Sequence, residues 1–136
     1  MEKLPYTPNT VLLRTFFGDD AAWVALCAAV QAPVGEFRAY VTPVDDPTYA
    51  ELSIEDVVAL ASDGERTFVL IADRVAQLDS EHPVLVVDLY AEPGRSFRVV
   101  PTEAWGVENN LSIANMDFDE FAGAVDERGV FRGFPP

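Results

Sequence analysis

The 136-residue sequence is short of cysteine and histidine, and this shortage excludes several kinds of site. Cys27 is the single cysteine, so an intrachain disulfide cannot form. Together with His82 it supplies too few ligands for a zinc site built from cysteine and histidine. The sequence also has no Gly-x-Ser-x-Gly motif and no glycine-rich phosphate-binding motif. We therefore expect no cofactor, and these absences favour a non-enzymatic protein while leaving the question of activity open.

Positive charge is scarce as well. Lys plus Arg number 9 against 23 Asp plus Glu, which gives a formal net charge of −14 at pH 7. Nucleic acids and anionic membranes are bound largely through lysine and arginine, so neither is an expected partner. A strongly acidic surface repels other acidic surfaces and attracts basic ones. The partner we expect is therefore another protein with a basic surface.

Long apolar runs are missing from the sequence. No run reaches the roughly 18 apolar residues of a membrane-spanning helix, and the first ten residues lack the apolar core of a signal peptide. With only one cysteine, this predicts a cytoplasmic protein. Apolar residues still make up 49% of the chain, enough for one core. We predict a single domain over residues 1–136, with residues 1–9 as a loose N-terminal segment.

Strand-like and helix-like segments alternate along the first two thirds of the chain. The predicted strands are residues 10–17, 37–41, 67–72, 83–90 and 96–100. Two of them, 67–72 and 83–90, are almost continuous apolar runs, which is typical of parallel strands buried on both faces. The pattern predicts an α/β fold with a mainly parallel sheet of about five strands, helices on both faces, an antiparallel edge strand at 96–100 and a C-terminal helix.

Several helix starts carry capping signals. Asp19 or Asp20 precedes an apolar stripe at helical spacing, and this helix is predicted to end near Pro33. Ser53 begins a capping box, and its helix is predicted to close at Asp63-Gly64. A short helix is expected at residues 74–78, between two of the strands. Asp117, with Glu120 at the third helical position, predicts the start of the C-terminal helix.

Aspartates follow most of the predicted strands. Because the carboxyl ends of parallel strands meet at one edge of a sheet, such side chains can gather there and hold a cation. The candidate ligands are Asp19, Asp20, Asp73 and Asp88. A small metal-assisted enzyme or ligand-binding domain that uses these residues is our alternative interpretation. The other interpretation is that these aspartates cap helices and solvate loops.

The segment ENNLSIANMDFDEFAGAV, residues 108–125, combines carboxylates with asparagines. The asparagines are either turn formers or contacts for a ligand or partner. Our first hypothesis is a non-enzymatic acidic binding module that docks on a basic partner, with a candidate interface of Asp45, Asp46, Asn109, Asn110, Asn115, Asp117 and Asp119. A homo-oligomer that forms through an edge strand or the Phe131 and Phe134 tail is a further possibility.

Four stretches of the chain together carry a family resemblance: RTFFGDDAAWVALCAAVQAP, FRAYVTPVDDP, VLVVDLY and ENNLSIANMDFDEFAGAVDERGVFRGF. They resemble an uncharacterised family of small acidic bacterial proteins of the actinobacterial type. The family has no established activity, so the resemblance implies no residue role. The last stretch is also similar, more loosely, to toxin-immunity proteins, which implies an immunity or inhibitor protein as one form of the binding module.

Overall fold

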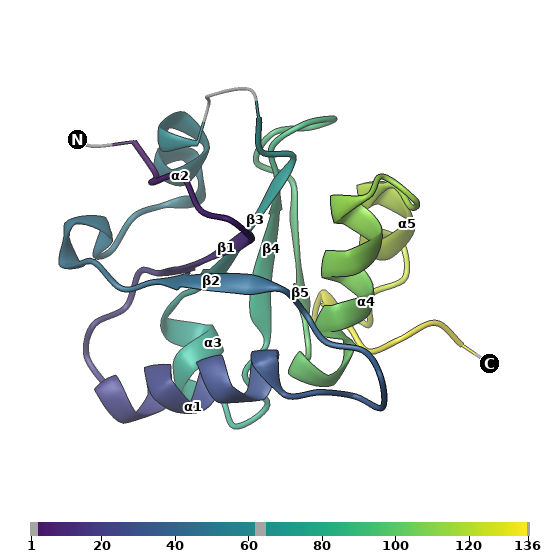
Figure 1. The fold of residues 1–136 in the computed structure, drawn as a ribbon, viewed down its shortest axis with the longest axis horizontal. Coiled ribbons are helices and arrows are strands. Elements are labelled where there is room, and N and C mark those ends of the chain that lie inside the picture. Colours follow the sequence, from purple (N-terminus) through teal and green to yellow (C-terminus); the bar gives the residue numbers. More distant parts are fainter. Residues whose placement is uncertain (1–2, 62–64, 136) are drawn as a thin grey trace.

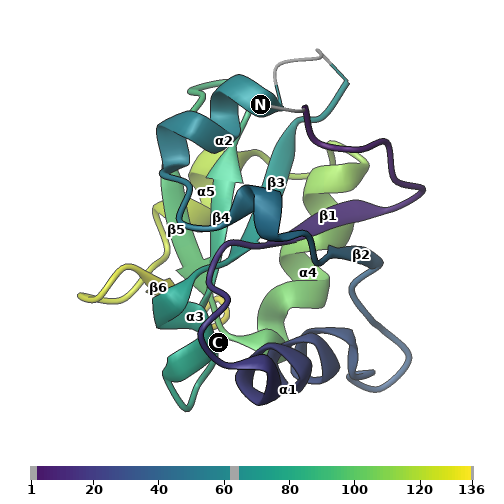
Figure 2. The same cartoon turned by 90° about the vertical axis from the view of Figure 1, so that its left-hand side faces the viewer.

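The computed structural model describes residues 3–61 and 65–135. Within these ranges the chain forms one six-stranded mixed sheet, in the order β2-β1-β3-β4-β5-β6, together with five α-helices (Figures 1 and 2). The elements in chain order are β1 (Thr10–Arg14), α1 (Asp20–Gln31), β2 (Val41–Val44), the 3₁₀ helix η1 (Pro47–Tyr49), α2 (Ile54–Leu60), β3 (Phe68–Ala72), α3 (Arg74–Leu78), β4 (Val84–Asp88), β5 (Ser96–Val99), α4 (Pro101–Ser112), α5 (Phe118–Ala122) and β6 (Val130–Phe131).

The α/β class is confirmed, but the prediction of a mainly parallel sheet is wrong. β2 and β3 run parallel to β1, and β6 runs parallel to β5, whereas β4 is antiparallel to both of its neighbours. β5 is also not the edge strand, because β6 lies outside it. β3 and β4 are buried throughout, as their apolar runs predicted. Burial does not fix direction, however, and residues 73–83 are fewer than the dozen or more that a parallel crossover needs.

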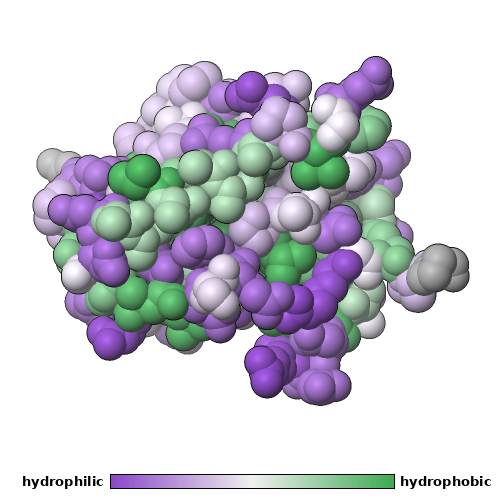
Figure 3. Space-filling view, turned by 90° about the horizontal axis from the view of Figure 1, so that it is seen from below, coloured by the Kyte–Doolittle hydropathy of each residue, from purple (hydrophilic) through white to green (hydrophobic). Residues whose placement is uncertain are grey.

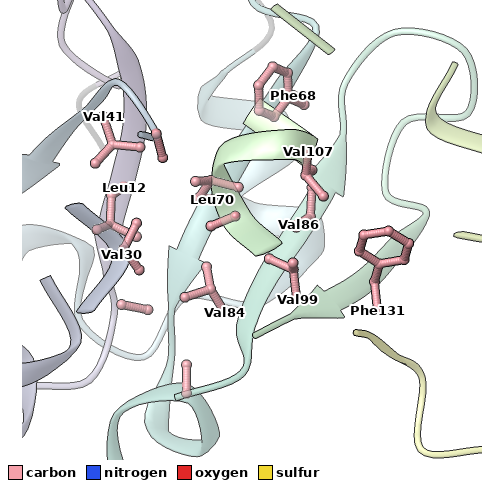
Figure 4. Close-up of a cluster of buried hydrophobic side chains, with 14 of the residues drawn as sticks. Leu12, Val30, Val41, Phe68, Leu70, Val84, Val86, Val99, Val107 and Phe131 are labelled. Atoms are coloured by element: carbon pink, nitrogen blue, oxygen red, sulfur yellow. The ribbon is translucent and has the colours of Figure 1, made fainter. Parts of the chain in front are cut away.

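The sheet separates two apolar layers. Leu12, Leu70 and Val86 point to the face that is covered by α1, α3, α4 and α5. Figure 4 shows Leu70 and Val86 near Val107 of α4, and Leu12 beside Val30 of α1. Alternate residues such as Leu13 point to the other face, which α2 and η1 cover. Figures 1 and 2 show α2 and α4 with the sheet between them. The prediction of helices on both faces is therefore confirmed.

The predicted helix starts are confirmed, because their signals are local. Asp19 is the N-cap of α1, and its carboxylate accepts a first-turn amide at 2.9 Å. Ser53 and Asp56 form a reciprocal capping box, with two bonds of 3.1 Å. Asp117 is the N-cap of α5, and its amide donates to Glu120 Oε1 at 3.1 Å. The short helix expected at residues 74–78 is α3.

Helix α4 is the largest element that the sequence patterns did not predict. Its buried positions are Ala104, Val107 and Glu108, so a charged residue interrupts the apolar stripe that would have marked the helix. The strand expected at 37–41 begins later, as β2, and contains Pro43, which an edge strand tolerates. None of the helices in the described part of the chain is long and apolar enough to cross a bilayer.

The N-terminal segment, which we expected to be loose, contacts α2 and η1. Leu4 is buried, and its amide donates to the Leu60 carbonyl at 3.2 Å. The Tyr49 hydroxyl donates to the Lys3 carbonyl at 3.0 Å. The predicted helix end at Asp63-Gly64 lies outside the described residues.

The C-terminal tail packs on α5. Phe131 is buried in β6, with its ring centroid 5.2 Å from that of Phe121. Phe134 is half exposed, and its ring lies 5.0 Å from that of Phe131. Arg132 joins the tail to the loop before β4 through Glu81, at 2.6 Å. The tail therefore packs onto the fold through Phe131.

Candidate functional site

Most of the aspartates proposed as metal ligands lie at one edge of the sheet, where β1, β2 and β3 end. We term this the carboxyl edge. Arg14, the last residue of β1, lies among them and is only 3% exposed. Its guanidinium donates to Asp20 at 2.7 Å and to Asp45 at 3.2 Å, and it lies 4.4 Å from the Phe17 ring centroid. Burial lowers the pKa of Arg14, but the bonds to Asp20 and Asp45 outweigh this effect and raise it above its usual value. The two carboxylates thus neutralise an internal cation.

The other aspartates at the carboxyl edge also have partners within the chain. Asp19 caps α1 and Asp46 caps η1. Asp73 caps α3 and forms a bidentate pair with Arg98, with distances of 2.9 and 2.7 Å. These contacts are those of helix caps and ion pairs, in agreement with the structural interpretation of the acids.

Asp88 lies at the opposite edge because β4 is antiparallel. The sheet register pairs Asp88 with Phe68 at the start of β3, whereas Asp73 follows the end of β3. The buried Asp88 carboxylate accepts the amides of Tyr90 at 2.9 Å and Glu92 at 2.8 Å, and so shapes the β4–β5 loop. The four proposed ligands do not converge. In residues 3–61 and 65–135, no group of three or more His, Cys, Asp or Glu is placed to hold a metal ion.

The opposite edge, where β1 and β3 begin and β4 ends, carries a row of hollows. Three pockets of about 600, 500 and 470 Å³ adjoin one another there. Thr67 and Phe68 line both the first and the second pocket, and Thr10 and Ser112 line both the second and the third. We term this row the amino-edge groove, and we number its pockets in this order.

Large apolar and aromatic side chains stand exposed along the amino-edge groove. Tyr90 in the first pocket is 78% exposed, and Tyr6 in the second is 86% exposed. Tyr40 and Ile113 in the third pocket are 50% and 73% exposed. Aromatic residues are enriched at protein interfaces, where they often carry much of the binding energy. This edge therefore offers apolar contact area.

The first pocket has an apolar floor between the β4–β5 loop and the turn that joins α4 to α5. The floor is made by residues from β3, α4, the turn and α5: Phe68, Leu111, Met116 and Phe118. Phe68 and Phe118 are buried and belong to the main core, against which Leu111 and Met116 also pack. The floor is thus held by the fold itself, and the pocket volume lies within the range of ligand sites.

The rim of the first pocket is charged. Glu92 and Arg95 stand on the β4–β5 loop, and Asp117 and Asp119 stand on the α5 side. Nη1 of Arg95 donates to Asp119 at 2.8 Å and to Glu92 at 3.1 Å, so one nitrogen atom connects the two walls. Three carboxylates against one guanidinium leave this rim negative.

The three asparagines of the predicted interface hold the end of α4 in place. Asn109 donates to the Arg38 carbonyl at 3.1 Å, and Asn110 donates to the Gly106 carbonyl at 2.7 Å. The Asn115 side chain donates to Asn110 Oδ1 at 2.9 Å, and the Asn115 backbone amide donates to the Asn110 backbone carbonyl, also at 2.9 Å. These bonds fix the end of α4, which contributes lining residues to both the first and the third pocket.

Glu108 is a site residue that the sequence reading did not single out. It is 3% exposed, and its carboxylate accepts the Tyr40 amide at 2.8 Å and the Thr10 hydroxyl at 2.9 Å, together with the Ser112 hydroxyl. Through these bonds it ties α4 to the starts of β1 and β2. The signal that could have found it is its spacing from Ala104, one turn earlier on the buried face.

The predicted interface is divided between the two edges. Asn109, Asp117 and Asp119 line the groove. Asn110 and Asn115 flank the groove at the end of α4. Asp45 and Asp46 lie at the carboxyl edge.

Comparison with known proteins places the chain in a family. No curated protein matches it. The model of one family, described as a domain of unknown function (DUF6924), matches residues 9–134. This range contains all six strands and both edges of the sheet, and it agrees with the expected resemblance to an uncharacterised family. The chain therefore belongs to the DUF6924 family of domains of unknown function.

Proposed function

We propose that the protein is a non-enzymatic binding module that holds a segment of a basic partner protein in the amino-edge groove. The observation that carries this proposal is the row of three adjoining pockets with exposed Tyr6, Tyr40, Tyr90 and Ile113 along it. Exposed tyrosines provide large apolar area and a hydrogen-bonding hydroxyl at a small cost in side-chain entropy. A partner segment would cover these side chains and place its own in the pockets.

Charge supports a basic partner. The protein has a formal net charge of −14, which would steer a positively charged protein toward it. Within the groove the negative charge is concentrated at the first pocket, around Glu92, Asp117 and Asp119. The second pocket is lined by one acidic and one basic residue, Glu65 and Arg66, and is closer to neutral. The proposal therefore places the partner's positive residues at the first pocket and its apolar residues along the rest of the groove.

An immunity or inhibitor protein of the bacterial cytoplasm, bound to a basic toxin, is the specific form of this proposal. Its support is the loose likeness of residues 108–134 to immunity proteins and the acidic charge of the chain. Residues 108–134 include the end of α4 and the α5 wall of the first pocket. The stretch that carries the likeness thus forms part of the proposed binding surface.

The experiment compares proteins retained from the native cell by three forms of the chain. These are the wild type, the groove variant Tyr90→Ser/Ile113→Ser, and the control Val24→Ser. Val24 is exposed on α1, which lies on the side of the molecule seen in Figure 3. The control thus removes an apolar side chain remote from the groove.

The expected result is a protein retained by the wild type and by Val24→Ser, but lost from the groove variant. Its retention should also weaken from low to high salt, because charge complementarity contributes to association. Partners that the groove variant retains as well as the wild type does would contradict the proposal. Retention that is insensitive to salt would contradict its electrostatic part.

A further inference from the structure

We propose that Arg95 is a built-in competitor in the first pocket, and that this pocket selects a partner arginine or lysine that displaces Arg95 from Asp119. The inference deepens the proposed function and rests on it. It identifies the part of the partner that enters the first pocket as a side chain with an apolar stem and a positive end.

The geometry of Arg95 is that of a side chain already occupying a cation position. One nitrogen atom, Nη1, bridges Asp119 on the α5 side and Glu92 on the β4–β5 loop. The side chain of Asp119 is 78% exposed and that of Glu92 is 68% exposed, so a second cation can reach both. The position between the two walls is therefore accessible from solvent while it is filled from within the chain.

The ion pairs of Arg95 with Asp119 and Glu92 should open easily. Ion pairs between exposed side chains contribute little to stability, because water and salt screen them. The hydrogen bond to Asp119 raises the pKa of Arg95 above its usual value, so Arg95 remains a cation over the whole physiological range. A partner cation can thus exchange with Arg95 at the two largely exposed carboxylates, at the cost of breaking its contacts with Asp119 and Glu92.

The apolar floor of the first pocket sets a second requirement for the ligand, in addition to its positive charge. The same pocket is lined by the apolar side chains of Phe68, Met116 and Phe118. Arginine and lysine place their methylene stems along apolar surface while the charged end remains at a polar rim. A neutral apolar side chain would occupy the floor without competing with Arg95, and a bare cation would compete without occupying the floor. The combination selects a ligand that has both parts.

The test uses two small probes of similar shape and NMR titration of the ¹⁵N-labelled protein. Phenethylammonium carries an aromatic ring and a positive charge, and 2-phenylethanol replaces the charge by a hydroxyl. Resonances of residues 88–95 and 116–119 report on the pocket. The variants are Arg95→Gln, which removes the competitor, and Asp119→Asn, which removes the acceptor. Arg74→Gln is the control, because it changes the net charge equally at an exposed position on α3.

Arg95→Gln should bind phenethylammonium about threefold or more tighter than the wild type, and Asp119→Asn about threefold or more weaker. Binding of 2-phenylethanol should change less than about twofold in both variants, and Arg74→Gln should resemble the wild type. Equal or weaker binding of phenethylammonium by Arg95→Gln would overturn the competitor role and leave the groove as a binding site. If neither probe shifts the pocket resonances at millimolar concentration, the inference fails. The proposed function then depends on the second and third pockets, which the retention experiment tests through Ile113.

Discussion

The carboxyl edge and the amino edge of the sheet carry different kinds of side chain. At the carboxyl edge, the aspartates cap helices or pair with Arg14 and Arg98, so their charges are used within the molecule. At the amino edge, tyrosines and Ile113 extend into solvent around three pockets. The acids of the carboxyl edge are thus satisfied within the molecule, which makes this edge the more self-contained one.

This difference has a cause in the topology. Open parallel sheets usually bind ligands where their strands end, because the loops there diverge to opposite faces. In this sheet the reversal of β4 sends the β4–β5 loop to the amino edge, where it meets the end of α4 and the start of α5. Two loops and a helix end then surround a hollow at the amino edge. The position of the candidate site therefore follows from the direction of one strand.

Removal of the Glu108 carboxylate is the change that we expect to disturb the amino edge most. Glu108→Ala would leave the Tyr40 amide and two hydroxyl groups without their acceptor, and should lower the free energy of unfolding by about 3 kcal/mol. Glu108→Gln keeps one acceptor oxygen and should cost about 1 kcal/mol. Urea unfolding monitored by circular dichroism measures both. Equal stability of Glu108→Ala and wild type would show that α4 is held over the groove by packing alone.

Removal of Arg14 tests the self-contained edge. Arg14→Ala loses the bonds to Asp20 and Asp45 and the stacking on Phe17, and should lower the free energy of unfolding by about 2 kcal/mol. Asp20→Asn should cost less than about 0.5 kcal/mol, because the Asp20 side chain is 89% exposed. The same urea titration measures both. A larger loss in Asp20→Asn than in Arg14→Ala would mean that the acids, and not the buried guanidinium, organise this edge.

Features that depend on neighbours along the chain could be predicted from the sequence. The caps at Asp19, Ser53 and Asp117 each involve residues three positions apart. Ser53 and Asp117 were predicted as caps, and Asp19 was one of two predicted candidates. The apolar runs around β3 and β4 predicted their burial for the same reason. The direction of β4 could not be read from its own residues, since a strand buried on both faces has the same pattern in either direction.

The candidate site was only partly predictable because it joins distant segments. Tyr6, Tyr40, Tyr90 and Ile113 are far apart in sequence, and an isolated tyrosine gives no sign of being exposed or buried. Tyr49, the remaining tyrosine and the last residue of η1, is in fact buried in the core. Acidic residues drew attention to 117–119 and also to the carboxyl edge, because charge alone does not distinguish a carboxylate with an internal partner from one at a pocket rim.

The smallest expected effect is the most informative for the comparison of the two edges. Tyr90 and Ile113 are largely exposed, so Tyr90→Ser/Ile113→Ser should change the free energy of unfolding by less than about 0.5 kcal/mol, as measured by urea unfolding. A loss of stability much larger than about 0.5 kcal/mol would mean that the two side chains support the fold. Partner loss in the groove variant would then have a structural origin. An unchanged stability would instead attribute partner loss in the groove variant to the removed contact surface, as the proposed function expects.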